Sequence, residues 1–318
     1  MRYRPFPATV GASSELGLEM VGVSPTARGG PAFGPNALRR ATDAGVTLFS
    51  VSAPAPPAID SLATMLGTPP EGRRWAVVCR FSSADLFGPD GVLPDAVDRV
   101  GDVLRSGHPQ LTVAIEVAPR SGTRRHPSEL ARELADLMRS TPASVWGLLV
   151  DESPPDEELL EAGVAAGARW LDVRSNLLNP EALMWRARRA GPEAVGLLVR
   201  DPFSQGRLDG QSIRAPPART ANRGPPPTVE QLSAEWAPVL RLNRLTDGRT
   251  RTLPQAALQY LLEAPPPLAV VVEPHPALGW EELLAVDALP PLSPEQRAWV
   301  EGRSAVGQHP APEFGSRE

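Results

Sequence analysis

The sequence predicts a (β/α)8 barrel, an α/β fold in which eight parallel strands alternate with helices. Eight short, mostly apolar runs are spaced along residues 18–272, and stretches with apolar residues at helical spacing separate most of them. The runs are apolar on both faces, which is typical of parallel strands covered by helices. Eight strands, most of them followed by a helix, match the count of a closed barrel.

The predicted strands lie, in chain order, at Leu18–Val23, Val46–Val51, Trp75–Cys79, Leu111–Val117, Val145–Val150, Trp170–Val173, Val195–Val199 and Leu268–Val272. The predicted helices lie at Asn36–Ala44, Ile59–Leu66, Leu93–Arg105, Pro127–Arg139, Asp156–Ala166, Pro180–Ala190 and Leu253–Glu263. Gly45 and Gly167 directly follow two of these helices, where a left-handed residue commonly ends a helix.

An open doubly wound sheet is the alternative fold. It requires a glycine-rich turn of defined spacing after the first strand. Residues 23–30 (VSPTARGG) contain glycines without that spacing, and a proline interrupts them. The barrel is therefore the preferred prediction.

Two segments stand outside the alternation. Asp201–Arg251 is rich in Pro, Arg and Gly and is predicted to be a long structureless connection after the seventh strand. Ser293–Glu301 is predicted to be a short extra helix capped by Ser293. The expected organisation is one barrel domain over residues 1–290, followed by a C-terminal helix and flexible tail over residues 291–318.

Composition excludes several classes of function. The net charge of −5 is spread without long runs, which argues against nucleic-acid or membrane partners. No stretch reaches the roughly 20 apolar residues that cross a bilayer, and the N-terminus does not resemble a signal peptide. We therefore expect a cytoplasmic protein. The chain contains one cysteine, so neither an intrachain disulfide nor a multi-cysteine metal site is expected.

Three local stretches and their order resemble the aldo-keto reductase family over roughly residues 15–290. Residues 37–49 (ALRRATDAGVTLF) are similar to that family's first helix and second strand. Asn176-Leu177-Leu178 is similar to its Tyr-Asn-Leu-Leu after the sixth strand, and residues 202–210 (PFSQGRLDG) to its motif after the seventh. The resemblance implies a barrel and, in the family, hydride transfer from NADPH to a carbonyl.

The four catalytic groups that the resemblance implies are absent from their expected places. The family's aspartate falls at Ser50, and its lysine falls at Cys79-Arg80 in a chain without any lysine. Its histidine falls near Glu116-Val117, and its tyrosine falls within residues 53–57 (APAPP). Arginine cannot replace the lysine directly, because it stays protonated. We expect the family's reaction to be lost.

We also expect no cofactor to be bound. The resemblance places basic residues for the 2′-phosphate of NADPH after the eighth strand. Residues 272–282 (VEPHPALGWEE) contain no Lys or Arg and three glutamates. Carboxylates repel a phosphate.

Residues at the carboxyl ends of barrel strands are the candidates for function. These ends carry Ser50 and Ser52, Arg80, Glu116, Asp151 and Glu152, Arg174, Arg200 and Asp201, and Glu273 and His275. One interpretation is a pocket for a zwitterionic or peptide-like ligand, with arginines for carboxylates and acids for amines. The other is a decayed site whose charges pair with one another. The ligand-binding candidates are Ser50, Arg80, Glu116, Asp151, Arg174, Arg200 and His275.

Three narrower hypotheses have weaker support. Asp151, Glu152 and His275 could ligate a metal, but their spacing forms no motif, and no metal is expected. Glu116 and Asp151 could form an acid/base pair. Cys79 could be a nucleophile activated by Arg80, although a lone cysteine in an apolar strand is more often a core residue.

The sequence thus predicts a catalytically inactive, aldo-keto reductase-like accessory protein that binds a small molecule or peptide. The chain has 38 prolines and no lysine, a composition typical of GC-rich coding. This suggests a pathway of modified-peptide biosynthesis in bacteria, whose proteins would be its partners. One alternative is a cofactor-independent isomerase, cyclase or hydrolase that uses Glu116, Asp151 or His275. Another is an NADPH-dependent reductase with relocated catalytic groups.

Overall fold

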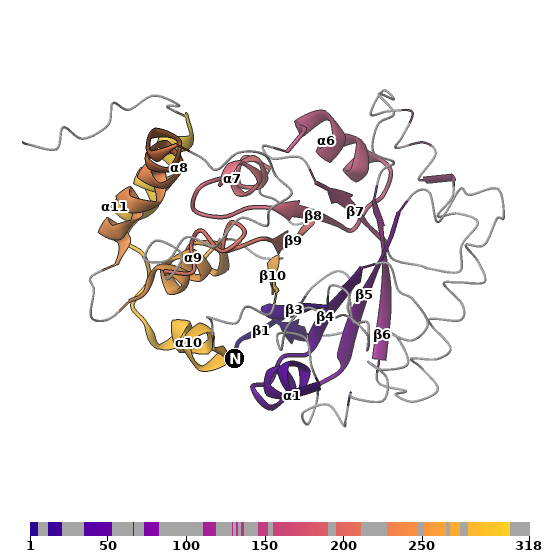
Figure 1. Cartoon of the computed structure of the whole chain (residues 1–318). Helices are drawn as coiled ribbons and strands as arrows, with labels where there is room; N and C mark the ends of the chain where they lie inside the picture. Colours follow the sequence, from indigo (N-terminus) through magenta and orange to yellow (C-terminus); the bar gives the residue numbers. More distant parts are fainter. Residues whose placement is uncertain are drawn as a thin grey trace, which may run out of the picture.

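The structure, a computed structural model, contains a closed barrel of eight parallel strands, as the sequence predicts (Figure 1). It describes residues 1–5, 12–20, 35–52, 66, 73–82, 111–118, 129, 132, 135–136, 146–151, 155–189, 195–210, 228–246, 251–264, 268–273 and 279–305. The barrel strands are β3 (Leu16–Met20), β4 (Leu48–Ser52), β5 (Trp75–Ser82), β6 (Leu111–Ala118), β7 (Trp146–Val150), β8 (Trp170–Arg174), β9 (Gly196–Arg200) and β10 (Leu268–Val272). Neighbours in the barrel follow the chain order, and β10 pairs with both β9 and β3, which closes it.

Alternation along each strand separates two apolar cores. Successive side chains of a strand point to opposite faces, so every second residue enters the barrel. The interior core consists of Leu48, Ala76, Val78, Trp170, Leu198, Ala269 and Val271. The intervening strand residues, such as Phe49, Val77 and Leu171, belong to the larger core between barrel and helices.

Trp170 belongs to the interior core, and Gly147, its neighbour on β7, leaves space for the indole ring. The Trp170 side chain is fully buried. Gly147 pairs with Trp170 across the strands, and a Cβ atom placed on Gly147 would lie 2.0 Å from the indole ring. Only glycine therefore fits at position 147 while the indole keeps its place.

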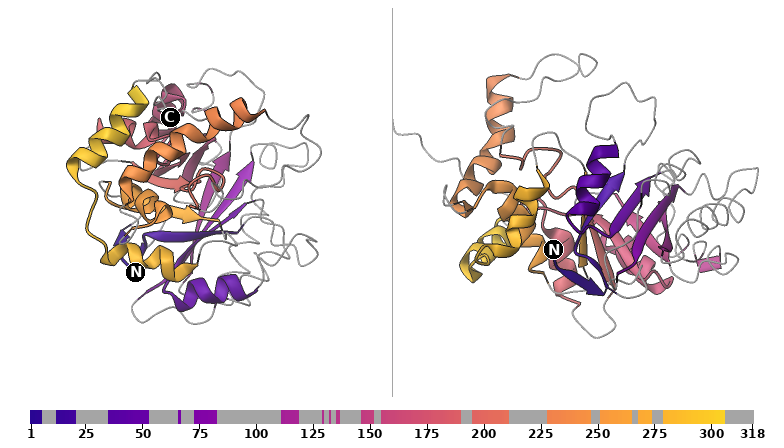
Figure 2. Two further views of the ribbon diagram at one scale, coloured as in Figure 1. Left: turned by 60° about the vertical axis from the view of Figure 1, so that its left-hand side comes forward. Right: turned by 90° about the horizontal axis from the view of Figure 1, so that it is seen from below.

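The described helices are α1 (Pro35–Asp43), α6 (Glu157–Ala165), α7 (Glu181–Ala187), α8 (Val229–Arg241), α9 (Leu253–Leu262), α10 (Trp280–Leu284) and α11 (Pro294–Ala305), with 3-10 turns η2 (Leu242–Leu245) and η3 (Ala285–Ala288). α6 packs on β7 and β8, and α9 packs on β10. All ten residues of α9 are buried, because α10, η2 and η3 contact it on its other sides. Figure 2 shows these later helices gathered on one side of the barrel.

The helix ends follow the predicted rules. Gly45 and Gly167 have φ values of 88° and 91°, a left-handed conformation that glycine adopts without strain. Ser293 caps α11 as predicted, because its Oγ accepts a hydrogen bond from the Gln296 backbone N–H at 3.2 Å. The predicted helices at 59–66 and 93–105 lie outside the described residues apart from residue 66.

One prediction is wrong, and one element was not predicted. Asp201–Arg251 is not a structureless connection, since residues 201–210 form consecutive turns and α8 and η2 occupy 229–245. The sequence also gave no sign of the antiparallel hairpin of β1 (Tyr3–Pro5) and β2 (Ala12–Ser14). Tyr3 donates a hydrogen bond to the Gly45 carbonyl at 2.8 Å, so the hairpin lies beside the start of β4, at the end of the barrel opposite the mouth.

Candidate functional site

A polar layer lies directly above the apolar interior, toward the carboxyl ends of the strands. It arises because an interior apolar residue is followed two positions later by a polar one. Ser50 follows Leu48, Arg80 follows Val78, Asp172 follows Trp170, Arg200 follows Leu198 and Glu273 follows Val271. Residues two apart on a strand share a face, so these side chains also point inward. Each is therefore held on a barrel strand or at its carboxyl end.

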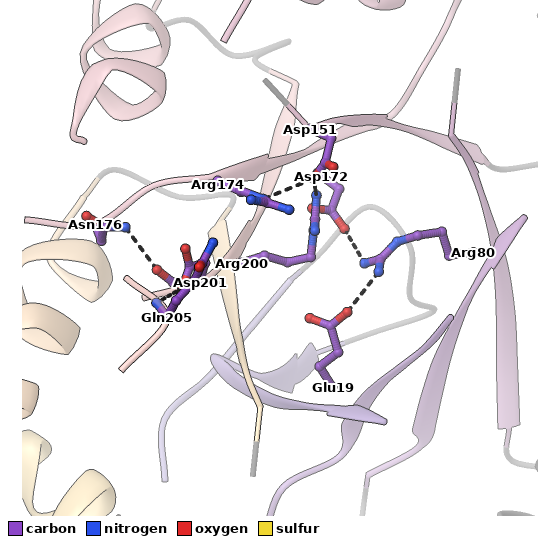
Figure 3. Close-up of polar contacts among 9 residues, drawn as sticks. All are labelled: Glu19, Arg80, Asp151, Asp172, Arg174, Asn176, Arg200, Asp201 and Gln205. Carbon is purple, nitrogen blue, oxygen red and sulfur yellow. Dashed lines mark hydrogen bonds and ion pairs between the residues drawn. The ribbon is translucent and has the colours of Figure 1, made fainter. Parts of the chain in front are cut away.

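Three of these inward-facing groups, together with Glu19 of β3, form an interior ion network, which we define as Glu19, Arg80, Asp172 and Arg200 (Figure 3). Arg80 donates from Nη1 to Glu19 Oε1 and from Nη2 to Asp172 Oδ2, both at 2.8 Å. The other oxygen of Asp172 accepts from Arg200 Nε. All four residues are buried. Their charges are balanced two against two, which offsets the large cost of desolvating them.

The network continues outward into the mouth of the barrel. Arg200 Nη2 lies 3.4 Å from Asp151 Oδ1, and Arg174 Nε lies 3.0 Å from the same oxygen. The side chain of Asp151 is 57% exposed and that of Arg174 is 33% exposed, whereas Asp172 is fully buried. Charges thus alternate along a path from the barrel interior to solvent.

Asp201 lies at the same mouth, directly after β9, in an unusual backbone conformation. Its φ of 54° is left-handed, which non-glycine residues adopt rarely and Asn and Asp adopt most readily. The Asp201 Oδ1 accepts from the Gln205 backbone N–H at 2.6 Å, and its carbonyl accepts from Asn176 Nδ2 at 3.0 Å (Figure 3). The bond from Asn176 joins the turn after β8 to the turn after β9, and the bond from Gln205 lies within the turn after β9.

Two carboxyl groups at the mouth hold their protons more tightly than usual. Burial is the largest cause that raises the pKa of Asp201 and also that of Glu273. For Glu273, repulsion from Glu19 and Asp201 raises the pKa further, while Arg200 and Arg174 lower it. We call Asp151, Arg174, Asp201 and Glu273 the mouth charges. They comprise three acids and one base.

The structure brings together five of the seven predicted site residues. Ser50 is buried, with its Oγ 3.4 Å from Arg80 Nη2. Arg80, Asp151, Arg174 and Arg200 belong to the ion pairs described above. Residue 116 pairs with residue 80 in the register of β5 and β6, but its side chain is outside the described residues. His275 is outside them as well.

Sequence reasoning missed Glu19 and Asp172, the two acids of the interior ion network. Each is a lone acid within an otherwise apolar strand or just before its end, in the runs LGLEM and WLDVR. A charge in a strand that is buried on both faces requires a partner. That signal lies inside the strands, whereas the predicted site residues lie at or after the strand ends.

The hypothesis that Cys79 is a nucleophile is wrong. Cys79 precedes the inward-facing Arg80, so it faces outward into the core between barrel and helices. It is fully buried, and burial raises the pKa of its thiol to about 12. The thiolate is the reactive form, so Cys79 is inert in the folded protein.

The two tyrosines of the chain both lie away from the mouth. Tyr3 is in the hairpin beside the start of β4, with the Arg73 guanidinium 3.9 Å from its ring centroid. Tyr260 is fully buried in α9, outside the barrel, and burial raises the pKa of its hydroxyl. Within the described residues, no group of three or more His, Cys, Asp or Glu is placed to hold a metal ion.

The geometry defines a class of protein: an α/β barrel with the aldo-keto reductase fold. The solved structures to which this chain is similar have the same fold. The glycerol dehydrogenase AKR11B4 of Gluconobacter oxydans matches with a TM-score of 0.62 at 15% sequence identity, over 99% of each chain. The aldo-keto reductase AKR11C1 of Bacillus halodurans matches over 95% of each chain in its apo form, with a TM-score of 0.57 at 16% identity. Its holo form gives a TM-score of 0.59 at the same identity.

At these identities the likeness establishes the fold and nothing finer. In sequence, no protein family and no curated protein matches the chain. A separate finding concerns membranes: none of the helices in the described part of the chain is long and apolar enough to span one.

Proposed function

We propose that this protein uses the aldo-keto reductase scaffold without hydride transfer, and that its mouth binds a zwitterionic small molecule or peptide. In this proposal it is an accessory protein of a biosynthetic pathway. The observation that carries the proposal is the position of Arg80 and its two ion pairs. It stands where the resemblance puts the catalytic lysine, and it is held between Glu19 and Asp172.

The surroundings of Arg80 support the loss of proton transfer. Ser50 stands beside it where the resemblance puts an aspartate. A general acid must lie within hydrogen-bond reach of its substrate. Neither Tyr3 nor Tyr260 is near this layer, and the chain has no other tyrosine.

The residues after β10 do not fit NADPH in the family's manner. Glu273 follows the strand directly, and Glu281 and Glu282 lie in the first turn of α10. Glu281 pairs with Arg40, and Glu282 accepts from the Thr252 hydroxyl at 2.8 Å. Phosphate would meet carboxylates at these positions instead of basic side chains. We therefore derive no step through a nicotinamide cofactor.

The mouth charges support a zwitterionic ligand. Arg174 and Arg200 both present nitrogen atoms to Asp151 at the mouth, where they could hold a carboxylate. Within the described residues, Asp201 and Glu273 form no ion pair, although Arg174 and Arg200 lower the pKa of both acids through space. A ligand ammonium group would relieve the repulsion between these two acids.

The first test is titration of the protein with NADPH, followed by the fluorescence of its seven tryptophans. We expect no saturable quenching and no NADPH oxidation in the presence of aldehydes or ketones. Saturable quenching at micromolar NADPH together with carbonyl-dependent oxidation would establish the reductase with relocated groups and refute the proposal.

One observation favours a second candidate, an enzyme that acts without a cofactor. The raised pKa values of Asp201 and Glu273 are typical of carboxyl groups that donate protons in catalysis. This points to those two acids, whereas the sequence pointed to Glu116, Asp151 or His275. Turnover of a bound ligand that disappears in both Asp201→Asn and Glu273→Gln would favour the enzyme. Ligand binding without turnover in the parent would favour the accessory protein.

A further inference from the structure

Asp151 places an exposed carboxylate between the two arginines that reach the mouth. One oxygen, Oδ1, lies 3.0 Å from Arg174 Nε and 3.4 Å from Arg200 Nη2. The arginines come from the adjacent strands β8 and β9, and residue 174 pairs with residue 200 in register. The geometry is that of a carboxylate bound by a pair of guanidinium groups, and here the chain itself supplies the carboxylate.

Arg200 is held in this orientation from behind. Its Nε donates to Asp172, which is fully buried and also accepts from Arg80 Nη2. Arg80 is fixed in turn by Glu19. The Arg200 guanidinium is therefore anchored at Nε by the buried carboxylate of Asp172, and Nη2 is the nitrogen turned toward Asp151. Preorganisation of this kind reduces the entropy that a ligand must overcome on binding.

Asp151 is held much less firmly than Asp172. Its side chain is 57% exposed, and its contact with Arg174 is an ion pair at the protein surface. Exposed ion pairs contribute little to stability because water and salt screen them. Asp172 has no such freedom, since it has no exposed surface and serves two arginines. Asp151 is therefore easier to separate from the two arginines than Asp172 is from the interior ion network.

We propose that Asp151 is an internal occupant of a carboxylate-binding site formed by Arg174 and Arg200, and that the carboxylate of the ligand displaces it. This rests on the proposed binding function and specifies its mechanism. A carboxylate fits better than a phosphate, because Asp201 and Glu273 lie close enough to influence the same arginines. A doubly charged phosphate meets more repulsion from these acids than a singly charged carboxylate.

The test measures binding of three probes by calorimetry at low ionic strength: glycylglycine, acetate and inorganic phosphate. Asp151→Asn removes the carboxylate that occupies Arg174 and Arg200. We expect this variant to bind glycylglycine and acetate about fivefold more tightly than the parent, because the ligand no longer competes with a surface ion pair. Adding Arg174→Gln should abolish the gain. Both positions are partly exposed, so the variants should fold, which circular dichroism checks.

Two controls separate displacement from a general change of charge. Glu157→Gln removes an equally exposed carboxylate, also 57%, from the surface pair with Arg188. It should leave all affinities unchanged. Asp201→Asn removes a neighbouring mouth charge that forms no ion pair with either arginine within the described residues, so its gain for acetate should be smaller than that of Asp151→Asn.

The outcomes distinguish this inference from the function on which it rests. If the parent binds glycylglycine and Asp151→Asn binds it no better, Asp151 is not an occupant, while the binding function stands. If the gain survives Arg174→Gln, or phosphate binds more tightly than acetate, the carboxylate site is wrong. If neither the parent nor the variants bind any probe, the charges are structural, and both proposals fall.

Discussion

At the scale of single residues, Asp172 is the central member of the interior ion network. It is fully buried and accepts hydrogen bonds from Arg80 and Arg200, which belong to strands far apart in the sequence. A buried ion pair gains little over an apolar pair, because desolvation cancels most of the attraction. Removing one partner is costly, however, since it leaves a buried charge without compensation. Asp172 serves two arginines, so its loss affects both.

We expect Asp172→Asn to lower the free energy of unfolding by about 3 to 5 kcal/mol, the cost of breaking a buried ion pair. Asn has the same shape but no charge, so the effect is electrostatic and not steric. Urea unfolding followed by tryptophan fluorescence measures it. Glu157→Gln, at an exposed ion pair, serves as the control and should change stability by less than about 1 kcal/mol. If Asp172→Asn also lowered the free energy of unfolding by less than about 1 kcal/mol, the interior ion network would not be a source of stability.

At the scale of elements, β4, β5, β8, β9 and β10 change character along their length. Their amino-terminal parts contribute apolar side chains to the interior, and polar side chains stand at or directly after their carboxyl ends. The apolar floor depends on the close fit between β7 and β8. Gly147 on β7 leaves the space that the Trp170 indole occupies, so the two positions depend on each other.

We expect Gly147→Ala to destabilise the protein by about 1 to 3 kcal/mol, the usual cost of overpacking a core. The added Cβ would lie 2.0 Å from an indole ring that is fully buried. The matched control is Gly302→Ala in α11, where a Cβ meets nothing within 4 Å. That change should stabilise by about 0.5 to 1 kcal/mol, because alanine favours helix over glycine. Urea unfolding curves that show equal effects for both variants would contradict the proposed fit.

At the scale of the whole molecule, carboxyl groups with raised pKa values occur at both ends of the barrel. Burial raises the pKa of Glu15 beside the hairpin, and of Asp201 and Glu273 at the mouth. The folded protein therefore binds protons at a pH where the unfolded chain has released them. For these groups the free energy of unfolding falls as the pH rises from the unfolded pKa, about 4, through the raised folded value.

We expect Asp201→Asn to be more stable than the parent at pH 7, with the difference shrinking toward zero near pH 4. Below the unfolded pKa of about 3.9, the aspartic acid is neutral in both states, so the substitution no longer removes a charge. Asn tolerates the left-handed backbone at position 201 and can still accept from the Gln205 N–H. Urea unfolding at pH 4, 5.5 and 7 measures the difference. A variant that is less stable than the parent at pH 7 would reverse the assigned sign.

The strands were the most predictable part of the molecule, because apolar runs such as Trp75–Ser82 are interrupted only near their ends. The hairpin at residues 3–14 was not predictable, since its strands are short and carry no alternating pattern. Helix α8 was missed because Pro238 lies within it and proline-rich sequence precedes it. At the site, residues directly after strands were found, whereas Glu19 and Asp172 were hidden inside apolar runs.

The sequence by itself determined the number and order of the barrel strands, the lack of any lysine, and the restriction of tyrosine to positions 3 and 260. These are properties of composition and local pattern, which do not depend on tertiary contacts. Only the tertiary structure decided which charges meet. Arg80 and Asp172 are 92 residues apart in sequence, and they touch because closure of the barrel directs alternate residues of every strand into one interior. Barrel closure thus joins strand-borne charges into a buried network and leaves Asp151 and Arg174 at its exposed end.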